Sequence, residues 1–183
     1  MIGIISYGAY IPRTRLPFSV IGGRPPKEGG PERSVAWNDE DAITQGAAAA
    51  IHCLEGFDRS QIDMVIFAST TLPFQEKQAA ALVARVLDLG REVQTADHTG
   101  STRSGTSALR AAVDAVKAGS AKCALVIASD ARLAAPKSGM EVNFGDGAAA
   151  FLVSDGEAIA TIEDSFSVTD EITDVWRPTG HDF

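Results

Sequence analysis

Hydroxyl and imidazole side chains gather in residues 97–103, directly before an Ala-rich helical stretch. Thr102 or Ser101 could act as a nucleophile, but a hydroxyl is a weak acid and needs an adjacent base. His98, four residues before Thr102, is the candidate base because imidazole titrates near neutral pH. The alternatives are that Ser101 or Thr102 caps the helix, that Thr102 contacts the substrate without reacting, and that His98 is an ordinary loop histidine.

Two charged residues flank these hydroxyls. We expect Asp97 to hold the loop by accepting hydrogen bonds from backbone N–H groups. Arg103 could bind a carboxylate or phosphate of a substrate in a bidentate way, or it could pair with Asp97 or Asp130. Both interpretations of Arg103 remain open from the sequence.

A second segment, residues 143–150, combines glycines with one acidic residue. Gly145, Asp146 and Gly147 could let backbone amides approach a phosphate, although a lone Gly-Asp-Gly is weak support for this. Gly and Asp are also the residues that a tight turn requires, so we interpret the segment as a structural turn into a buried strand. Asn143 and Phe144 precede the turn and are expected near a substrate pocket.

Composition excludes several classes of function. The chain has 183 residues, 45% of them hydrophobic, which fits one soluble domain. A net charge of -8 without a basic stripe disfavours nucleic-acid binding. No apolar run approaches a membrane span and the start lacks a signal-peptide pattern, so we expect a cytoplasmic protein without membrane contact. Cys53 and Cys123 lack metal-ligand spacing, so we expect core packing and no metal.

Strand-like and helix-like segments alternate along the chain. Apolar runs predict strands at residues 2–10, 63–69, 93–96, 123–129, 143–154 and 158–167. Helical spacing predicts helices near 38–54, 76–89 and 102–118. The alternation implies βαβ units and a mostly parallel sheet with helices on both faces. Residues 17–36 are expected to form a loop insert, since they are rich in Pro and Gly and lack a period.

Three motifs together resemble those of a known protein family. In DHTGSTRSGTSAL (residues 97–109), Asp97 lies five residues before Thr102, and Ala108 and Leu109 lie six and seven after it. FGDGAAA (144–150) has a Gly-Asp-Gly-Ala core, and ASTT (68–71) is followed by Lys77. These motifs resemble the nucleophile elbow, the GDGA strand and the catalytic-Glu segment of the thiolase superfamily. The resemblance is to 3-hydroxy-3-methylglutaryl-CoA (HMG-CoA) synthases and type III 3-oxoacyl-carrier-protein synthases.

The resemblance implies a fold and an assembly. We expect an α/β thiolase-like half domain, with a five-stranded mixed sheet flanked by helices, over residues 1–167. Residues 168–183 would begin the connection to a second half, which in the family supplies the catalytic His and Asn. The chain would then be truncated or one subunit of a split enzyme. The family dimerises through its third strand, here 93–96, so a homodimer is expected.

Two departures from the family pattern bear on function. Thr102 stands where the family has its nucleophilic Cys, and Thr70 stands where the synthases have an acid–base Glu. The resemblance still implies an enzyme that acts on acyl-CoA or acyl-carrier thioesters and forms or cleaves carbon–carbon bonds, with no bound cofactor. Thr70 and Arg103 would contact substrate. The alternatives are a non-catalytic partner that scaffolds a thiolase or aldolase, and a conventional synthase that uses Cys53 or Cys123.

Overall fold

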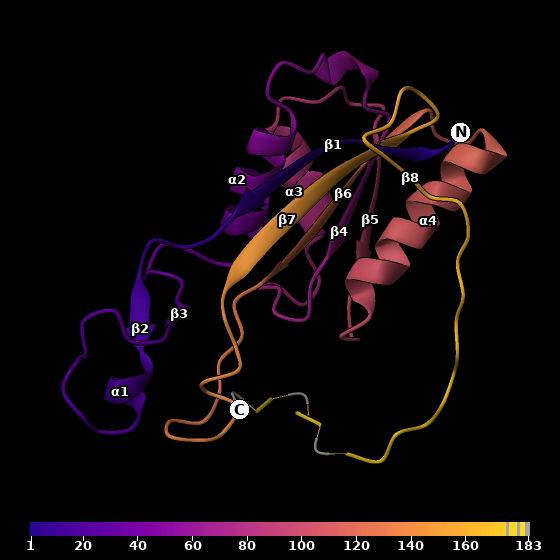
Figure 1. Ribbon diagram of the computed structural model, residues 1–183. Helices are drawn as coiled ribbons and strands as arrows, with labels where there is room; N and C mark the ends of the chain where they lie inside the picture. Colours follow the sequence, from indigo (N-terminus) through magenta and orange to yellow (C-terminus); the bar gives the residue numbers. More distant parts are fainter. Residues whose placement is uncertain (175, 179, 182–183) are drawn as a thin grey trace.

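The computed structural model describes residues 1–174, 176–178 and 180–181. One mixed sheet of six strands forms the body of the molecule, in the order β5-β4-β6-β7-β1-β8 (Figure 1). The strands are β1 (Gly3–Tyr10), β4 (Met64–Ala68), β5 (Gln94–His98), β6 (Cys123–Asp130), β7 (Gly147–Ser154) and β8 (Ala160–Thr161). The expected mixed sheet flanked by helices is therefore present, with six strands, one more than the five expected. The additional strand is β8, whose two residues pair with Gly3 and Ile4 at the sheet edge.

Parallel pairing is confined to one part of the sheet. Strand β4 runs parallel to β5 and to β6, whereas β6–β7, β7–β1 and β1–β8 pair antiparallel. The expectation of a mostly parallel sheet is therefore wrong for the half that holds β7, β1 and β8. The reason is the connection after β6, which contains no helix to carry the chain back across the sheet before β7 begins.

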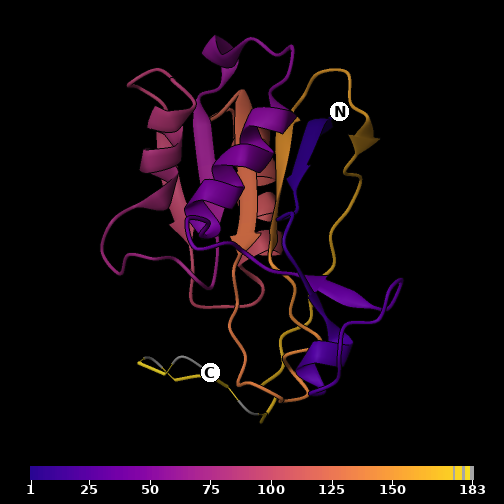
Figure 2. The same cartoon turned by 90° about the vertical axis from the view of Figure 1, so that its left-hand side faces the viewer.

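Helices cover both faces of the sheet (Figure 2). Helices α2 (Ala42–Cys53) and α3 (Ala79–Val86) pack with Phe67, Leu125 and Leu152 in one apolar cluster. Helix α4 (Ser104–Ala118) packs on the opposite face against Ile66, Val126 and Val153. Both clusters are rich in alanine, which brings the helices close to the strands. No helix in the described part of the chain is long and apolar enough to cross a membrane.

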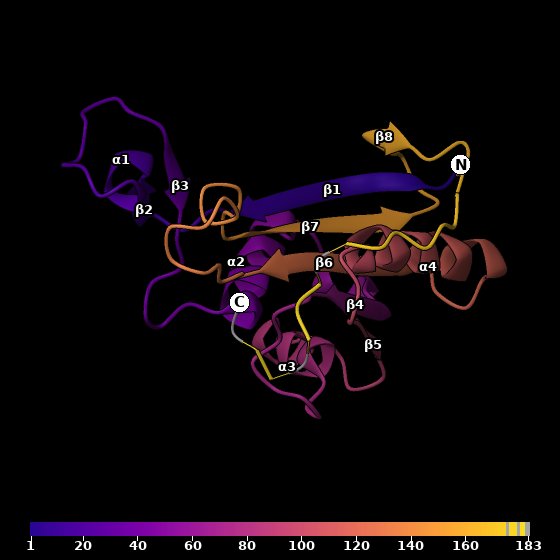
Figure 3. The same cartoon turned by 90° about the horizontal axis from the view of Figure 1, so that it is seen from below.

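The segment expected to be a loop insert contains short regular elements instead. Strands β2 (Arg15–Pro17) and β3 (Glu32–Ser34) form an antiparallel pair, and α1 (Phe18–Ile21) lies between them. A salt bridge of 3.3 Å joins Arg15 to Glu32 across this pair. Strands of three residues are too short to show a period of two in the sequence. The unit projects from the end of the sheet (Figure 3). A short 3-10 helix, η1 (Arg59–Gln61), precedes β4.

Candidate active site

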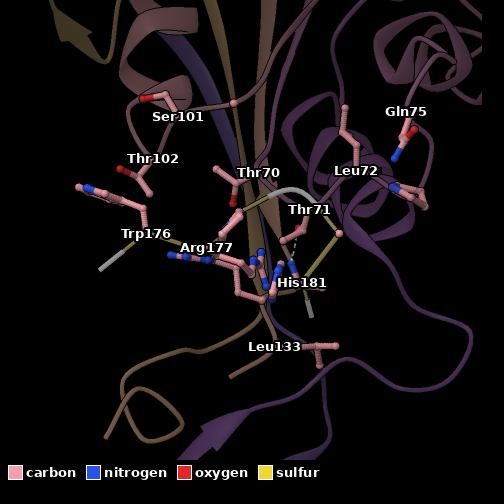
Figure 4. A pocket seen from close by; sticks show the side chains of 16 residues that line it. Thr70, Thr71, Leu72, Gln75, Ser101, Thr102, Leu133, Trp176, Arg177 and His181 are labelled. Atoms are coloured by element: carbon pink, nitrogen blue, oxygen red, sulfur yellow. Dashed lines mark hydrogen bonds between the residues drawn. The ribbon is translucent and has the colours of Figure 1, made fainter. Parts of the chain in front are cut away.

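The carboxyl ends of the three parallel strands meet at one edge of the sheet, and a cavity of about 1080 Å³ lies there (Figure 4). Crevices outside the carboxyl ends of parallel strands are the usual ligand sites of α/β sheets. Thr70 and Thr71 reach the cavity after β4, Thr102 after β5 and Arg132 after β6. The described lining residues are Thr70, Thr71, Leu72, Pro73, Gln75, Gly100, Ser101, Thr102, Ala131, Arg132, Leu133, Trp176, Arg177, Pro178, Gly180 and His181.

One carboxylate oxygen of Asp130 holds the loop that follows β4 and lines this site. Asp130 Oδ1 accepts hydrogen bonds from the Ser69 hydroxyl (3.0 Å), the Thr70 N–H (2.7 Å) and the Thr70 hydroxyl (3.0 Å). The Thr71 hydroxyl donates to the same oxygen over 2.9 Å, and accepts from the Ala131 N–H over 3.0 Å. The loop after β4 is therefore tied to the end of β6. Thr70, one of the predicted substrate contacts, lines the cavity but commits its hydroxyl proton to Asp130.

The two elbow hydroxyls lie at the cavity wall, just before α4 (Figure 4). The helix begins at Ser104, and its N-cap residue is Arg103, whose side chain makes no cap hydrogen bond. Ser101 Oγ accepts a hydrogen bond of 3.1 Å from the backbone N–H of Arg103. Neither Ser101 nor Thr102 occupies the N-cap position, so the capping interpretation is wrong for Thr102, whereas Ser101 does accept a backbone N–H directly before the helix. Both residues are exposed, which leaves their hydroxyls open to a ligand.

The other two predicted residues of the elbow lie beside the cavity and do not line it. Asp97 accepts hydrogen bonds from the backbone N–H groups of Ala79 (2.6 Å) and Ala80 (2.8 Å), at the start of α3. His98 ends β5 and is half-buried, and its carbonyl oxygen accepts the N–H of Ser69 over 3.1 Å. Asp97 therefore holds a helix in place, and His98 is absent from the described lining.

Arg103 and Asn143, both predicted near substrate, lie outside the cavity. The guanidinium of Arg103 donates to the Ser167 hydroxyl over 3.1 Å, and no hydrogen bond or ion pair with Asp97 or Asp130 occurs within the described residues. Asn143 is exposed in the turn before β7. A side chain at the first turn of a helix can point to either side, and spacing alone did not reveal which.

The Gly-Asp-Gly turn connects β7 to the projecting unit. Asp146 Oδ2 accepts the Ala36 N–H over 2.7 Å, and the Asp146 carbonyl accepts the Ser34 hydroxyl over 2.7 Å. Burial raises the pKa of Asp146 above its usual value. A Cβ on Gly147 would lie 3.2 Å from the Tyr10 carbonyl oxygen, and one on Gly145 would lie 3.2 Å from Ser34 Oγ. These contacts are structural, and none of the three residues lines the cavity.

Phe144 lines a second cavity, of about 370 Å³, which shares Arg132 with the first. The Arg132 guanidinium lies 4.3 Å from the centroid of the Phe144 ring. Sequence reasoning missed Arg132, although its position directly after a buried strand was a usable signal. It also missed His181 and Trp176 as lining residues; Trp176 is 61% exposed and lines both cavities.

The described lining of the cavity contains no cysteine that could supply a thiolate. Cys53 and Cys123 are free thiols buried in the core with α2, which confirms their predicted packing role. Burial and then the nearby Asp63 raise the pKa of Cys123 to about 12. Burial likewise raises the pKa of Cys53. Among the described residues, no group of His, Cys, Asp or Glu could hold a metal ion.

Comparison with known proteins places this geometry in a family. Residues 96–170 match the family model for 3-oxoacyl-[acyl-carrier-protein] synthase III. The hydroxymethylglutaryl-CoA synthase of Pyrococcus horikoshii is 33% identical, over 96% of this chain and 52% of its own length. That of Archaeoglobus fulgidus is also 33% identical, over 97% of this chain and 54% of its own length.

Solved structures agree with this placement. An HMG-CoA synthase complexed with CoA superposes with a TM-score of 0.87 at 28% identity, over 98% of this chain and 49% of that chain. The 3-oxoacyl-[acyl-carrier-protein] synthase III of Aquifex aeolicus superposes with a TM-score of 0.76 at 26% identity, over 86% of this chain and 55% of that chain. The chain thus spans about half the length of these relatives. It belongs to the thiolase-like superfamily, among the proteins like HMG-CoA synthase and 3-oxoacyl-carrier-protein synthase III.

Proposed function

We propose that this chain supplies the first half of an acyl-CoA-dependent enzyme that forms or cleaves carbon–carbon bonds, of the HMG-CoA synthase-like type. The observation that carries the proposal is that Ser101 and Thr102 share one cavity with Thr70 and Thr71 at the carboxyl ends of the parallel strands. Two related structures, of an HMG-CoA synthase and of MvaS, contain CoA and 3-hydroxy-3-methylglutaryl-CoA. A coenzyme A thioester is therefore the proposed substrate.

The chemistry we propose is an aldol or retro-aldol step without an acyl-enzyme, because the described lining holds no cysteine. In the aldol direction, a base removes a proton from the α-carbon of one thioester. The resulting carbanion attacks the carbonyl carbon of a second molecule, and the new alkoxide takes up a proton. The retro-aldol direction reverses these steps. This chemistry needs an oxyanion hole and a base but no thiolate.

Hydrogen-bond donors to the alkoxide would come from the elbow. Ser101 Oγ accepts the Arg103 N–H, so its own proton can point to a ligand. Thr102 supplies a second hydroxyl on the same wall. His98 remains the base expected from the sequence, although it lies beside the cavity and outside its described lining, and a second half would complete the site. The covalent alternative is that Thr102 or Ser101 attacks the thioester after deprotonation by such a base.

A homodimer is the proposed assembly. Strand β5 is the outer strand of the sheet, next to β4 on one side only. Pairing of β5 with the same strand of a second copy would extend the sheet across a two-fold axis and satisfy its open backbone groups.

A second candidate function is a non-catalytic subunit that scaffolds a catalytic thiolase or aldolase. One observation favours it: the described cavity lining contains neither a cysteine nor a carboxylate residue. A scaffold would keep its partner's turnover when Thr102, Ser101 and His98 are replaced, whereas an enzyme would lose its own.

The experiment is intact-mass spectrometry of the protein, with any partner that it retains, after incubation with acetyl-CoA and with acetoacetyl-CoA. Thr102→Ala and Ser101→Ala are the controls. An acyl adduct that disappears in one control establishes a hydroxyl nucleophile. Binding of the thioesters without an adduct supports the noncovalent step. If neither an adduct nor binding is detected, the enzymatic proposal is overturned and the scaffold is favoured.

A further variant, Thr102→Cys, separates a pocket that binds thioesters from one that does not. A thiol before a helix N-terminus is acylated readily once a thioester is seated. An adduct on this variant, absent from the parent protein, would show that the cavity holds the thioester at the elbow. A variant that remains unmodified at saturating thioester would contradict the proposed position of the substrate.

A further inference from the structure

Arg132 occupies the border between the two cavities. It follows the last residue of β6 by two positions and lines both the 1080 Å³ cavity and the 370 Å³ cavity. The first cavity presents the hydroxyls of Thr70, Thr71, Ser101 and Thr102. The second is largely apolar, and its described lining residues are Arg132, Leu133, Ala134, Ala135, Ser138, Met140, Phe144, Trp176, Arg177 and Pro178.

The guanidinium of Arg132 is held in place before any ligand arrives. Its central carbon lies 4.3 Å from the centroid of the Phe144 ring, a cation–π contact. Phe144 is itself anchored, because Arg33 donates a hydrogen bond of 2.8 Å to its carbonyl oxygen. A preoriented guanidinium loses little side-chain entropy when it binds an anion.

The Arg132 guanidinium forms no salt bridge within the described residues, although the Asp146 carboxylate interacts with the backbone N–H of Arg132. The salt bridges there are Arg15–Glu32 and Arg110–Asp114, neither of which includes Arg132. Asp130 is two positions away, but its Oδ1 accepts hydrogen bonds from Ser69, Thr70 and Thr71. The Nε of Arg132 is buried and has no hydrogen-bond partner among the described residues. Because this Nε is enclosed by protein, a ligand would meet the terminal nitrogens of the guanidinium.

We propose that Arg132 selects acyl thioesters whose acyl chain ends in a carboxylate, and that it binds this carboxylate where the two cavities meet. This inference rests on the proposed function, since it assigns a substrate class to the same site. The acyl group is the better source of the anion than the phosphates of CoA. Arg132 shares its cavity with the reacting elbow, whereas the long pantetheine arm separates the phosphates from the thioester.

The test compares two thioesters of equal chain length, glutaryl-CoA and pentanoyl-CoA, by isothermal titration calorimetry on the protein with any partner that it retains. The parent protein should bind glutaryl-CoA about tenfold or more tightly than pentanoyl-CoA, as expected for a charge-assisted bidentate contact. Arg132→Met should abolish this preference and leave pentanoyl-CoA binding within about twofold. Arg110→Met, an exposed arginine on α4 outside both cavities, is the matched control and should retain the preference.

Each other outcome is decisive. No preference in the parent protein, or an equal loss for both thioesters in Arg132→Met, overturns the inference and assigns the arginine to the CoA phosphates or to no ligand. If the parent protein binds neither thioester, the proposed function is overturned as well. If Arg132→Met does not fold, Arg132→Lys replaces it. This variant keeps the charge but loses the planar fork, so it should retain only part of the preference.

Discussion

Thr70 donates both its backbone N–H and its hydroxyl to the same carboxylate oxygen, Asp130 Oδ1, over 2.7 and 3.0 Å. The two residues lie 60 positions apart in the chain, and the parallel pairing of β4 with β6 brings them together. Thr70 stands where related synthases are expected to carry a catalytic carboxylate. Here the hydroxyl at that position donates a hydrogen bond to Asp130. This bond helps to hold the loop that forms one wall of the cavity.

Replacement of Asp130 by alanine should therefore destabilise the protein. Four donors from Ser69, Thr70 and Thr71 would lose their common acceptor in a half-buried position. We expect the free energy of unfolding to fall by about 2–3 kcal/mol in chemical denaturation, since unsatisfied partners cost more than the bond itself contributes. Asp155→Ala, at an exposed bend, is the control and should change little. Equal stability of the two variants would contradict the role assigned to Asp130.

Helix α3 depends on Asp97 for its first turn. Its own N-cap residue, Gln78, makes no side-chain cap hydrogen bond, whereas Asp97 accepts from Ala79 and Ala80. Asp97→Ala should lower the free energy of unfolding by about 1–2 kcal/mol, as the loss of a helix cap does. Asp97→Asn keeps one acceptor and should lose less, which thermal and urea denaturation can measure. A loss as large for Asn as for Ala would indicate that the negative charge, rather than the acceptor, matters.

Gly8 lies where β1 crosses closest to α2. A Cβ there would lie 2.3 Å from both the Ala49 carbonyl oxygen and the Cys53 backbone nitrogen. Because backbone atoms cannot move aside as a flexible side chain can, Gly8→Ala should cost about 3 kcal/mol or prevent folding. Gly139→Ala, at a position with no atom within 4 Å, should express and melt like the parent. A Gly8→Ala protein with unchanged melting temperature would show that the strand and helix are less tightly packed.

The buried thiols should resist alkylation in the folded protein. The raised pKa of Cys53 and the pKa of about 12 at Cys123 keep both thiols protonated near neutral pH. Iodoacetamide should label both cysteines after unfolding in urea and neither before, as mass spectrometry would detect. Rapid labelling of one cysteine in the folded protein, blocked by acetyl-CoA, would favour a conventional synthase that uses this thiol.

The same pKa predicts the direction of an alkaline effect on stability. A thiol with a usual value of 9.0 ionises in the unfolded chain while Cys123 stays protonated in the folded one. Below pH 9.0 both states are protonated and the effect vanishes, whereas between 9.0 and about 12 the unfolded state is favoured as pH rises. The free energy of unfolding of the parent should therefore fall more steeply over this range than that of Cys123→Ala. Parallel pH curves for the two proteins would contradict the assignment.

The sequence by itself determined the class of fold and the order of its main elements. Apolar runs such as residues 123–129 and Ala-rich helical stretches are local signals, and the elbow and GDGA motifs carry their spacing within a few residues. The family could be identified from these motifs, and the positions of Thr102 and Thr70 followed from the same spacing. Short elements such as β2 and β3 were missed because three residues show no periodicity, and the strand expected at residues 158–167 is reduced to the two residues of β8.

Only the tertiary structure decided which side chains share the site. Arg103 is adjacent to the elbow in sequence, yet it bonds Ser167 on the outside, whereas Arg132 comes from the end of β6 and lines the cavity. Asp130 contacts Thr70 through the pairing of β4 with β6, which no local pattern encodes. The physical reason is that a site at the edge of a sheet is assembled from the ends of several strands. Strand order and the direction of each side chain therefore determine its members, and sequence proximity does not.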